Sequence, residues 1–390
     1  MITAIAVHGF RSIRELVLDL HGLDVVTGAN GSGKSNLYRA LRLLAECSDG
    51  SIIGSLAHQG GLSSVLWAGP EKLSSSMRRG EAPVQGTMRR ESISLRLGFA
   101  SDDFGYLLDL GLPQPAGKSL PTMFCRDPQI KREQVFVGAA ARGGAVLVDR
   151  QGALARARDG GDWLELSRNL LPSESMLHEV ADGLRAPELY RVRQMMRSWR
   201  FYDGFRTDEL AAARWPQVGT RSPVLNHDGA NLAAAWQTAV EAGSGAALEA
   251  AIDRAFPGSS VVIEAREGQF QTTLRQPGML RALSAAELSD GTLRYLLLCA
   301  ALLTPRPPEL MVLNEPETSL HADLLPAVAE LIVEAARHCQ LLVVTHSEQL
   351  RALLARHPEV HQHELVKELG ETRILGLGLL DAPAWTWPSR

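Results

Sequence analysis

Length, composition and charge set the first limits on this chain. It has 390 residues, of which 45% are hydrophobic and 22% charged, and a formal net charge of −4. These values suit a globular protein with more than one core, and they exclude a general positive field that would attract nucleic acid.

The first ninety residues predict strands, one helix and a loop. Alternating apolar residues predict strands at 2–7 and 16–20, and a short apolar run predicts a strand at 23–26 that ends at Gly28. Leu37, Leu41 and Leu44 have helical spacing, and this helix should end near residues 48–50. Residues 51–90 are rich in Gly, Ser and Pro and are predicted to form a loop.

The rest of the chain predicts a sheet, then helices, then alternating strands and helices. Residues 92–150 predict an antiparallel sheet of about four strands, 160–255 are mainly helical in pattern, and 261–274 predict a hairpin. After residue 290, helices alternate with the apolar strands LMVL and LLVVT. We therefore expect an α/β fold whose core comprises residues 1–50 and 259–390, interrupted by a mixed, largely helical insertion at 51–258.

A glycine-rich motif joins the strand that ends at Gly28 to the next helix. Residues 28–35, GANGSGKS, match the G-x-x-x-x-G-K-[ST] pattern of a phosphate-binding P-loop. We expect Lys34 to bridge the β- and γ-phosphates of ATP and the Ser35 hydroxyl to ligate Mg²⁺. The alternative is a glycine-rich turn that merely contains Lys-Ser. The predicted nucleotide-binding residues of this motif are Asn30, Gly31, Ser32, Gly33, Lys34, Ser35 and Asn36.

Two apolar strands in the last third of the chain end in polar residues. MVLNEPE places Asn314 and Glu315 after one strand, and LLVVTHS places His346 after the next. Because nucleotides bind at the carboxyl ends of parallel strands, Glu315 is predicted to orient or deprotonate the attacking water and His346 to contact the γ-phosphate. The alternatives are a solvent-exposed acid and a structural histidine.

A fourth motif, Leu288-Ser289-Asp290-Gly291-Thr292, directly precedes a long apolar helix. Ser and Gly at a helix N-terminus form an anion site. Taken alone, however, the motif is better interpreted as an ordinary helix cap with Ser289 or Asp290 as the N-cap residue.

Together, the four motifs resemble the ABC-type ATPase heads of RecF, SMC and OLD proteins, and above all the stand-alone bacterial ATPases of the AAA_21 family. The likeness covers residues 1–70 and 255–355 and continues through SWRFYDGF and NHDGANLAAAW. It implies an ABC-type ATPase head, with a P-loop NTPase core and an antiparallel β subdomain. It also implies that ELSDGT is the signature loop, SLH at 319–321 the D-loop, and GFRSI the N-terminal "FRS" segment. In such proteins two heads face each other, so the likeness implies a homodimer with two ATP molecules between the chains. Ser289 and Gly291 of one chain then close over ATP held by the P-loop of the other.

Asn314 departs from the resembled family, whose members usually have Asp at this position. Asn keeps an acceptor oxygen for a Mg²⁺-bound water but removes a negative charge, so Mg²⁺ affinity should fall by about 10- to 100-fold. Hydrolysis should be retained but slow, with Ser35 and Asn314 as the metal residues. The Q-loop residue stays open among Gln59, Gln134 and Ser175.

An arginine-rich segment, Arg185–Arg221, is a candidate DNA-binding surface. It holds eight arginines and four acidic residues, with Trp199, Tyr202 and Trp215 among them. Arginines with interleaved aromatic residues can hold phosphates and stack on bases. The alternative, arginines paired with acidic residues on a solvated helix, has equal weight.

These motifs predict an ATPase (ATP phosphohydrolase) that uses Mg²⁺ and acts as a dimerising switch in DNA repair or antiphage defence. The alternative is an ATP-dependent scaffold that assembles with a separate effector protein, a nuclease or toxin, with incidental hydrolysis. The widely separated cysteines, the lack of a signal-peptide pattern and the short apolar runs predict a cytoplasmic protein without membrane contact.

Overall fold

The chain divides into two compact units in the computed structural model, which describes residues 1–70, 77, 94–113, 123–180, 182–377 and 383–388. Unit 1 consists of Met1–His21, Gly28–Trp199 and His363–Arg390, and unit 2 of Gly22–Thr27 and Arg200–Gln362. This division differs from the one expected from the sequence, because the strands that follow residue 94 extend the sheet that the first strands begin.

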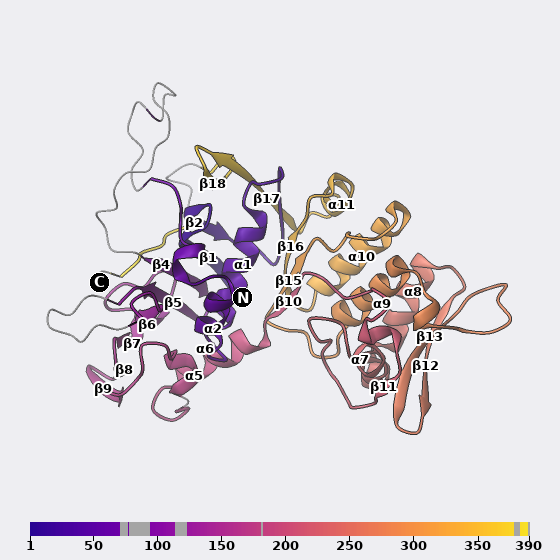
Figure 1. The fold of residues 1–390 in the computed structure, drawn as a ribbon, viewed down its shortest axis with the longest axis horizontal. Coiled ribbons are helices and arrows are strands. Elements are labelled where there is room, and N and C mark those ends of the chain that lie inside the picture. The colour runs from indigo at the N-terminus through magenta and orange to yellow at the C-terminus, as the bar shows by residue number, and fades with distance from the viewer. Residues whose placement is uncertain (71–76, 78–93, 114–122, 181, 378–382, 389–390) are drawn as a thin grey trace. The chain divides into compact units, whose positions relative to one another are not determined.

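Unit 1 is built on an eight-stranded antiparallel sheet (Figure 1). The four strands expected between residues 92 and 150 are confirmed as β4 to β7. Residues 154–167, expected to be connecting or helical, form two further strands in which only the small side chains of Ala155 and Ala157 are buried, so the apolar signal is weak. The strand order is β2 (Ile13–Asp19), β1 (Ile2–Phe10), β4 (Leu95–Ser101), β5 (Phe104–Gly111), β6 (Gln129–Val137), β7 (Val146–Gln151), β8 (Leu154–Asp159) and β9 (Asp162–Ser167).

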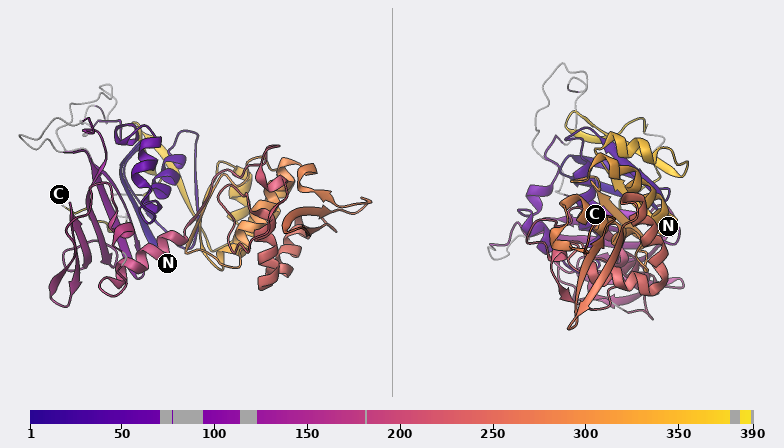
Figure 2. Two further views of the ribbon diagram at one scale, coloured as in Figure 1. Left: turned by 60° about the horizontal axis from the view of Figure 1, so that its bottom comes forward. Right: turned by 90° about the vertical axis from the view of Figure 1, so that its right-hand side faces the viewer.

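Helices pack against this sheet in unit 1 (Figure 2). α1 (Lys34–Ala45) contacts β1 and β4, and α6 (Pro187–Ser198) contacts β5, β6 and β7. Trp199, at the end of α6, packs edge-on against Phe99 of β4, with 5.1 Å between the ring centroids. Two short helices, α2 (Ile52–His58) and α3 (Leu62–Val65), contradict the loop expected at 51–90. They form because their apolar side chains are buried, which overrides the local Gly and Ser content. Residues 71–76 and 78–90 of the expected loop lie outside the described residues.

The C-terminal segment, residues 383–388, packs on the face of the sheet opposite to Trp199, because Gly98 and Phe99 are consecutive in β4 and point to opposite faces. Trp385 packs edge-on against Phe136 of β6, with ring centroids 5.9 Å apart, and against Trp387 at 5.2 Å. The indole N–H of Trp387 donates a hydrogen bond to Glu15 of β2 (3.3 Å). Gly98 of β4 leaves the space for this contact, since a Cβ there would lie 2.6 Å from the Trp385 ring.

A buried ion pair ties α5 (Met176–Glu179) to the sheet of unit 1. The side chains of Arg150 and Glu133 are fully buried and lie 2.6 Å apart. Glu133 also accepts hydrogen bonds from the hydroxyls of Tyr106 and Ser175, both at 2.6 Å, and from the backbone N–H of Met176. A buried charge pair is tolerated when its remaining hydrogen-bonding capacity is satisfied in this way.

Unit 2 contains a parallel sheet with the order β10 (Arg200–Tyr202), β15 (Leu310–Asn314), β16 (Gln340–Val344) and β3 (Leu23–Gly28). α9 (Asp290–Leu302) is buried at every position from 293 to 302, as expected of a helix that is apolar on all sides except at Arg294. α9 shares its core with α7 (Leu232–Ala239), α8 (Gly245–Ala255), α10 (Leu325–Ala336) and α11 (Glu348–Leu354).

The remaining strands form a small sheet in unit 2 and a hairpin near the C-terminus. The hairpin expected at 261–274 is confirmed as β12 (Ser260–Arg266) and β13 (Gln269–Arg275), which extends away from α8 and α9 in Figure 1. β11 (Gln217–Val218) and β14 (Leu283–Ser284) also pair with β13. β17 (Val360–Glu368) and β18 (Glu371–Ile374), which the sequence did not predict, form an antiparallel pair. Among the described residues, no helix combines the length and the apolar character that a membrane span requires.

Candidate functional site

The P-loop of unit 1 has a backbone shape that two of its glycines permit. Gly31 and Gly33 have φ of 81° and 112°, in the left-handed region that L-residues rarely adopt. A Cβ on Gly33 would lie 2.1 Å from the Thr372 hydroxyl, whereas a Cβ on Gly31 would meet nothing within 4 Å. The loop is therefore tightly packed at the start of α1 and open at Gly31, where a phosphate group has room to enter.

Three side chains, two of them distant in sequence, brace this loop. The Thr372 hydroxyl of β18 donates to the backbone carbonyl of Ser32 (2.8 Å) and lies 2.7 Å from the hydroxyl of Ser12. Ser12 in turn accepts a hydrogen bond from the side-chain amide of Asn36 (2.8 Å). Asn36, predicted as a nucleotide contact, thus has a bracing role in the loop.

Lys34 folds back over the P-loop. Its buried ammonium group donates to the carbonyl oxygens of Gly28 (2.5 Å) and Ala29 (3.2 Å). These carbonyl oxygens stand in the place of the phosphate oxygens that the ammonium group would contact with ATP bound. Ser35, in the first turn of α1, is exposed and can present its hydroxyl to a metal ion.

Glu315 and His346 lie together at the carboxyl ends of β15 and β16 in unit 2. The Nδ1 atom of His346 is 3.4 Å from the carboxylate of Glu315, and both side chains are partly exposed. Glu315 has a φ of 52°, and its backbone N–H donates to the carbonyl of Val344 (2.7 Å). Non-glycine residues with positive φ concentrate at functional sites, because the surrounding structure must hold them there.

Glu317 organises the loop that carries His346. One carboxylate oxygen of this buried residue accepts hydrogen bonds from the Thr345 hydroxyl (2.6 Å) and from the backbone N–H groups of His346 and Ser347 (3.2 Å each). The same oxygen lies 3.4 Å from Nδ1 of His346. The imidazole is therefore held between two carboxylates, which fixes its orientation.

Asn314, the last residue of β15, suits an outer contact to a hydrated metal ion. Its side-chain oxygen is buried and has no hydrogen-bond partner among the described residues. A buried acceptor without a donor is costly unless a water or ligand supplies the donor. Mg²⁺ keeps several of its waters in proteins, and one of these would satisfy Asn314.

The signature loop of unit 2 exposes Ser289 at the start of α9. The Ser289 side chain caps the helix by accepting a hydrogen bond from the backbone N–H of Thr292 (3.1 Å). A Cβ on Gly291 would lie 2.9 Å from the backbone oxygen of Ser319, so this glycine packs against the D-loop. Ser289 is thus the helix cap that the sequence predicted, and its exposed position leaves it free to meet an anion as well.

Comparisons with known proteins identify the family. The AAA_21 family model, described as "AAA domain, putative AbiEii toxin, Type IV TA system", matches residues 25–352. The chain belongs to the AAA_21 family. A search of the curated proteins finds no match.

Solved structures place this AAA_21 chain in the fold of SMC heads. It is similar to an SMC head bound to the C-winged helix domain of ScpA, with 13% identity over 98% of this chain and 99% of that chain and a TM-score of 0.52. Further matches are the SMC head domain from Thermotoga maritima (14% identity, 97% and 99% coverage, TM-score 0.47) and the ScpA-bound SMC head from Pyrococcus furiosus (13%, 98% and 97%, 0.49). The first likeness confirms the ABC-type ATPase head expected from the sequence.

Within the AAA_21 chain, the predicted site residues fall into two groups. Residues 30–36 lie together in unit 1, whereas Asn314, Glu315, His346, Ser289 and Gly291 belong to unit 2. Sequence reasoning missed Glu317, although a second acid two residues after Glu315 in the same loop was a usable signal. It also missed Thr372, for which no local signal exists because its partner Ser32 is 340 residues away.

The three Q-loop candidates have different surroundings. Gln134 donates to Asp149 inside the sheet (2.7 Å), and Ser175 belongs to the buried Glu133 network. Gln59 instead accepts a hydrogen bond from the guanidinium of Arg11 (3.0 Å), in the turn that also carries Ser12. Gln59 is therefore the candidate that we retain as a prediction.

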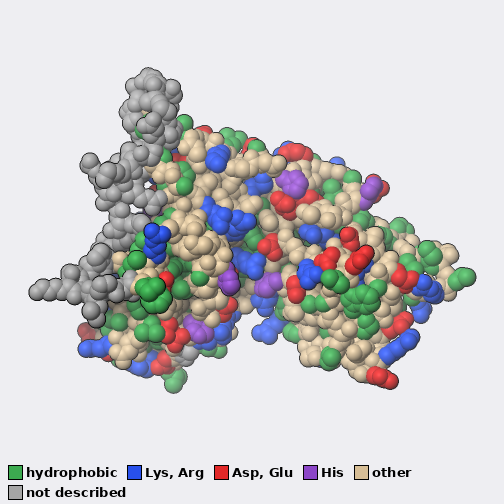
Figure 3. Space-filling view, in the orientation of Figure 1, with side chains coloured by type: hydrophobic (Ala, Val, Ile, Leu, Met, Phe, Trp, Pro, Cys, Tyr) green, Lys and Arg blue, Asp and Glu red, His purple; other side chains and the backbone are tan. Residues whose placement is uncertain are grey.

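The arginine-rich segment 185–221 is largely engaged in ion pairs and packing. Helix α6 ends at Ser198, so Arg200 lies in β10 and does not share the helical face of Arg193 and Arg197 as the sequence suggested. The face drawn in Figure 3 shows basic and acidic side chains intermixed over the helices of unit 2. Trp199 and Tyr202 are buried, while Trp215 is exposed. Four of the eight arginines pair with acids: Arg185 with Asp182, Arg206 with Asp208, Arg214 with Asp290 and Arg221 with Glu241.

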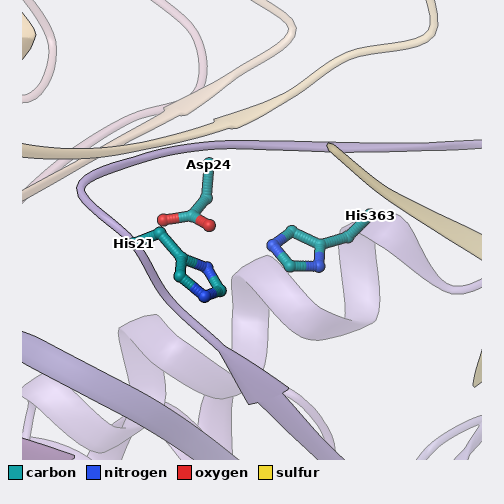
Figure 4. Close-up of side chains that lie close together, drawn as sticks. All are labelled: His21, Asp24 and His363. Carbon is teal, nitrogen blue, oxygen red and sulfur yellow. The ribbon is translucent and has the colours of Figure 1, made fainter. Parts of the chain in front are cut away.

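Figure 4 draws His21, Asp24 and His363, three potential metal ligands. His21 and His363 belong to unit 1, where His21 also lies 3.3 Å from the carboxylate of Asp19. Asp24 is a fully buried residue of β3 in unit 2. We assign no site to these residues, because they are divided between the two units.

Proposed function

We propose that this chain binds and hydrolyses ATP as a molecular switch, and that it does so as a homodimer with ATP held between the P-loop of one chain and the signature loop of the other. The observation that carries this proposal is the arrangement of Glu315 beside His346, with Glu317 fixing the His346 loop. A pocket kept only for nucleotide binding has no need of this arrangement.

Each residue has a role in the proposed reaction. Glu315 takes the proton of the attacking water, and His346 holds the γ-phosphate end of the nucleotide. Lys34 exchanges the carbonyl oxygens of Gly28 and Ala29 for phosphate oxygens. Ser35 would hold Mg²⁺ directly and Asn314 would hold it through a water, and the ion would supply positive charge that offsets the charge of the phosphates.

The signature loop supports a shared site. Ser289 and the N-terminus of α9 form an exposed anion site that faces away from the core of their own unit. A symmetric dimer places this loop against the P-loop of the partner, and the same contact occurs twice. Because two chains are needed for each site, the rate per chain must rise with protein concentration.

The biological role is less constrained, and two candidates remain. DNA repair or antiphage defence is our first proposal. The ion pairs of the arginine-rich segment 185–221, however, do not support a DNA-binding surface on that segment. An ATP-dependent scaffold for a separate effector is the second, and the similar SMC head whose structure includes a bound ScpA domain favours it. In that case dimerisation would need ATP binding but not turnover.

The test is Mg²⁺-dependent ATP hydrolysis measured over a range of protein concentrations. We expect the specific rate to rise with concentration, and to fall by at least about 100-fold in Glu315→Gln, which removes the base. Ser289→Arg should be equally inactive, because it blocks the contact with the partner. Glu267→Gln, at an exposed turn that also has positive φ, is the matched control and should keep full activity.

The outcomes separate the two candidate functions. A specific rate independent of concentration would contradict the shared site. If ATP binds and causes dimerisation but the rate equals that of Glu315→Gln, the scaffold is correct and hydrolysis is not part of the function.

A further inference from the structure

A buried arginine that belongs to none of the four sequence motifs, Arg214, holds the signature loop through hydrogen bonds. Arg214 follows β10 in a short 3-10 turn, Ala212–Arg214, and only 6% of the residue is exposed. Its guanidinium donates to the backbone oxygens of Ala285 (3.0 Å) and Leu288 (2.7 Å) and to the carboxylate of Asp290 (2.6 Å). These acceptors lie on both sides of Ser289 in the sequence, and two of them belong to its direct neighbours.

A buried cation at this position needs negative partners close to it. The N-terminus of α9 carries partial positive charge, so a buried guanidinium there is repelled by the helix dipole. Asp290, the first residue of α9, offsets the repulsion through its ion pair with Arg214. The Nε–H group of Arg214 also donates to the carbonyl of Thr207 (2.9 Å), which anchors the side chain at its base.

The opposite side of the loop is held by a second ion pair. Arg281 contacts both carboxylate oxygens of Glu287, at 2.5 and 2.8 Å. The Arg281 guanidinium, together with the backbone and side chain of Ser284, lowers the pKa of Glu287 to about 2. Because this pair is exposed, its contribution to stability is small, and the buried Arg214 is the stronger constraint.

We propose that Arg214 is the positioning residue of the signature loop, holding Ser289 and the backbone N–H groups of residues 290 and 291 in the geometry that accepts the phosphate of a nucleotide bound to the partner. This inference rests on the shared site proposed above. Arg214 does not touch the nucleotide. It acts by fixing the loop before the partner arrives, so that little freedom is lost when the two chains meet.

Arginine is required here because of the shape of its side chain. A guanidinium carries five N–H donors in a planar fork, and Arg214 directs them at the Thr207 carbonyl and at four acceptors of the signature loop, which belong to residues 285, 286, 288 and 290. A lysine at this position would keep the charge but could not reach these acceptors together. Arg214→Lys should therefore fall between wild type and Arg214→Ala.

The experiment measures activity in mixtures of two inactive variants. Arg214→Ala should lower the ATPase rate by about 100-fold, the effect expected of a displacement of roughly 1 Å in a catalytic group. ATP binding by its own P-loop should be unchanged. Lys34→Ala has the complementary defect, because its P-loop is damaged but its signature loop is intact.

Mixing equal amounts of Arg214→Ala and Lys34→Ala chains should restore about one-quarter of the wild-type rate. Half of the dimers that form contain one chain of each variant, and each of these has one of its two shared sites intact. A defect of folding, or a defect of Arg214→Ala in its own P-loop or Glu315, would give no recovery. Ser289→Arg mixed with Lys34→Ala is the reference for a signature-loop defect.

The outcomes distinguish this inference from the function on which it rests. If the reference mixture recovers activity and the Arg214→Ala mixture does not, Arg214 does not position the signature loop and the inference is wrong. If neither mixture recovers, the shared site itself is wrong, and this inference is overturned with it.

Should Arg214→Ala fail to fold, Asp290→Asn removes the charged partner of Arg214 and should give a smaller loss with the same recovery in mixtures. Arg221→Ala, which breaks an exposed ion pair with Glu241, is the matched control and should be as active as wild type.

Discussion

At the scale of single residues, the backbone of Glu315 is the most informative feature. Its positive φ turns the chain sharply after β15, and hydrogen bonds hold the turn: the N–H of Glu315 donates to Val344, and the N–H of Thr318 (3.1 Å) and the Arg294 guanidinium (3.2 Å) donate to its carbonyl. Burial lowers the pKa of Arg294, while Glu317 and Glu315 act to raise it. The backbone of Glu315 is thus held in this conformation from the neighbouring strand, loop and helix.

Asn314 provides a prediction about the metal. Asn314→Asp adds a negative charge at the end of β15, next to the proposed hydrated Mg²⁺. We expect the Mg²⁺ concentration for half-maximal ATPase activity to fall by about 10- to 100-fold, as for other residues that contact a metal through water. The measurement is a titration of ATPase activity with Mg²⁺ at saturating ATP.

The control for Asn314→Asp is Asn169→Asp, which adds the same charge to an exposed residue of unit 1. An unchanged Mg²⁺ requirement in Asn314→Asp would show that this side chain does not contact the hydrated metal. In that event the buried oxygen of Asn314 needs another donor.

His8 gives a prediction about stability and pH. Burial lowers the pKa of His8 below the ordinary value of 6.5, against an opposing effect of Glu15. The unfolded chain therefore takes up a proton on His8 more readily than the folded chain does. The contribution of neutral His8 to stability is fully present above pH 6.5 and is lost as the pH falls through the pKa of the folded state. Urea unfolding at about pH 7.5 and about pH 5.5 should show a smaller loss of stability in His8→Phe than in wild type. Equal losses in the two proteins would assign the pH dependence to other groups.

At the scale of elements, the C-terminal segment acts as a cover for the sheet of unit 1. Trp385 contributes to a cluster with buried apolar residues on that face, among them Ala100, Leu107 and Phe136. Trp385→Ala should lower the free energy of unfolding by about 1–3 kcal/mol, because the lost ring is partly rather than fully buried. Denaturant unfolding followed by circular dichroism measures this change without depending on tryptophan fluorescence.

Gly98→Ala tests the same contact from the side of the sheet. Its Cβ would lie 2.6 Å from the Trp385 ring and 2.8 Å from the backbone oxygen of Tyr106, so the segment must move away and the pairing of β4 with β5 must shift. Gly144→Ala adds a methyl group where nothing lies within 4 Å, and it is the matched control. If Gly98→Ala is as stable as Gly144→Ala, the C-terminal segment contributes little to the stability of unit 1.

The elements that the sequence predicted are those with a strong local pattern. The P-loop strand and helix, the strands before Asn314 and His346, and the signature helix α9 all follow from apolar periodicity and motif spacing. β8 and β9 were missed because their only buried residues are two alanines, so the apolar alternation is weak. β17 and β18 were missed because 360–374 is mostly polar, and only their pairing with each other reveals them.

At the scale of the whole molecule, the sequence predicted a core in two halves. The structure has two units, and the chain passes from one to the other several times. The order of motifs was sufficient to identify the ATPase head and to name Glu315, His346 and the P-loop residues as candidates. Long-range contacts could not be predicted in this way. Thr372 on Ser32, Arg214 on Leu288 and Trp385 on the sheet each join segments whose local sequence is unremarkable, and only the fold brings them together.

The brace of the P-loop by Thr372 has a consequence for the order in which the protein is made. Ribosomes release the chain from its N-terminus, so residues 28–35 emerge long before β18 and the Trp385 segment. During that interval the Ser32 carbonyl lacks the Thr372 hydroxyl, and one face of the unit 1 sheet lacks its cover. A nascent chain thus reaches a competent nucleotide loop only after unit 2 has been synthesised. Translation cut short before residue 372 would yield a product that retains every ATPase motif and yet binds ATP poorly.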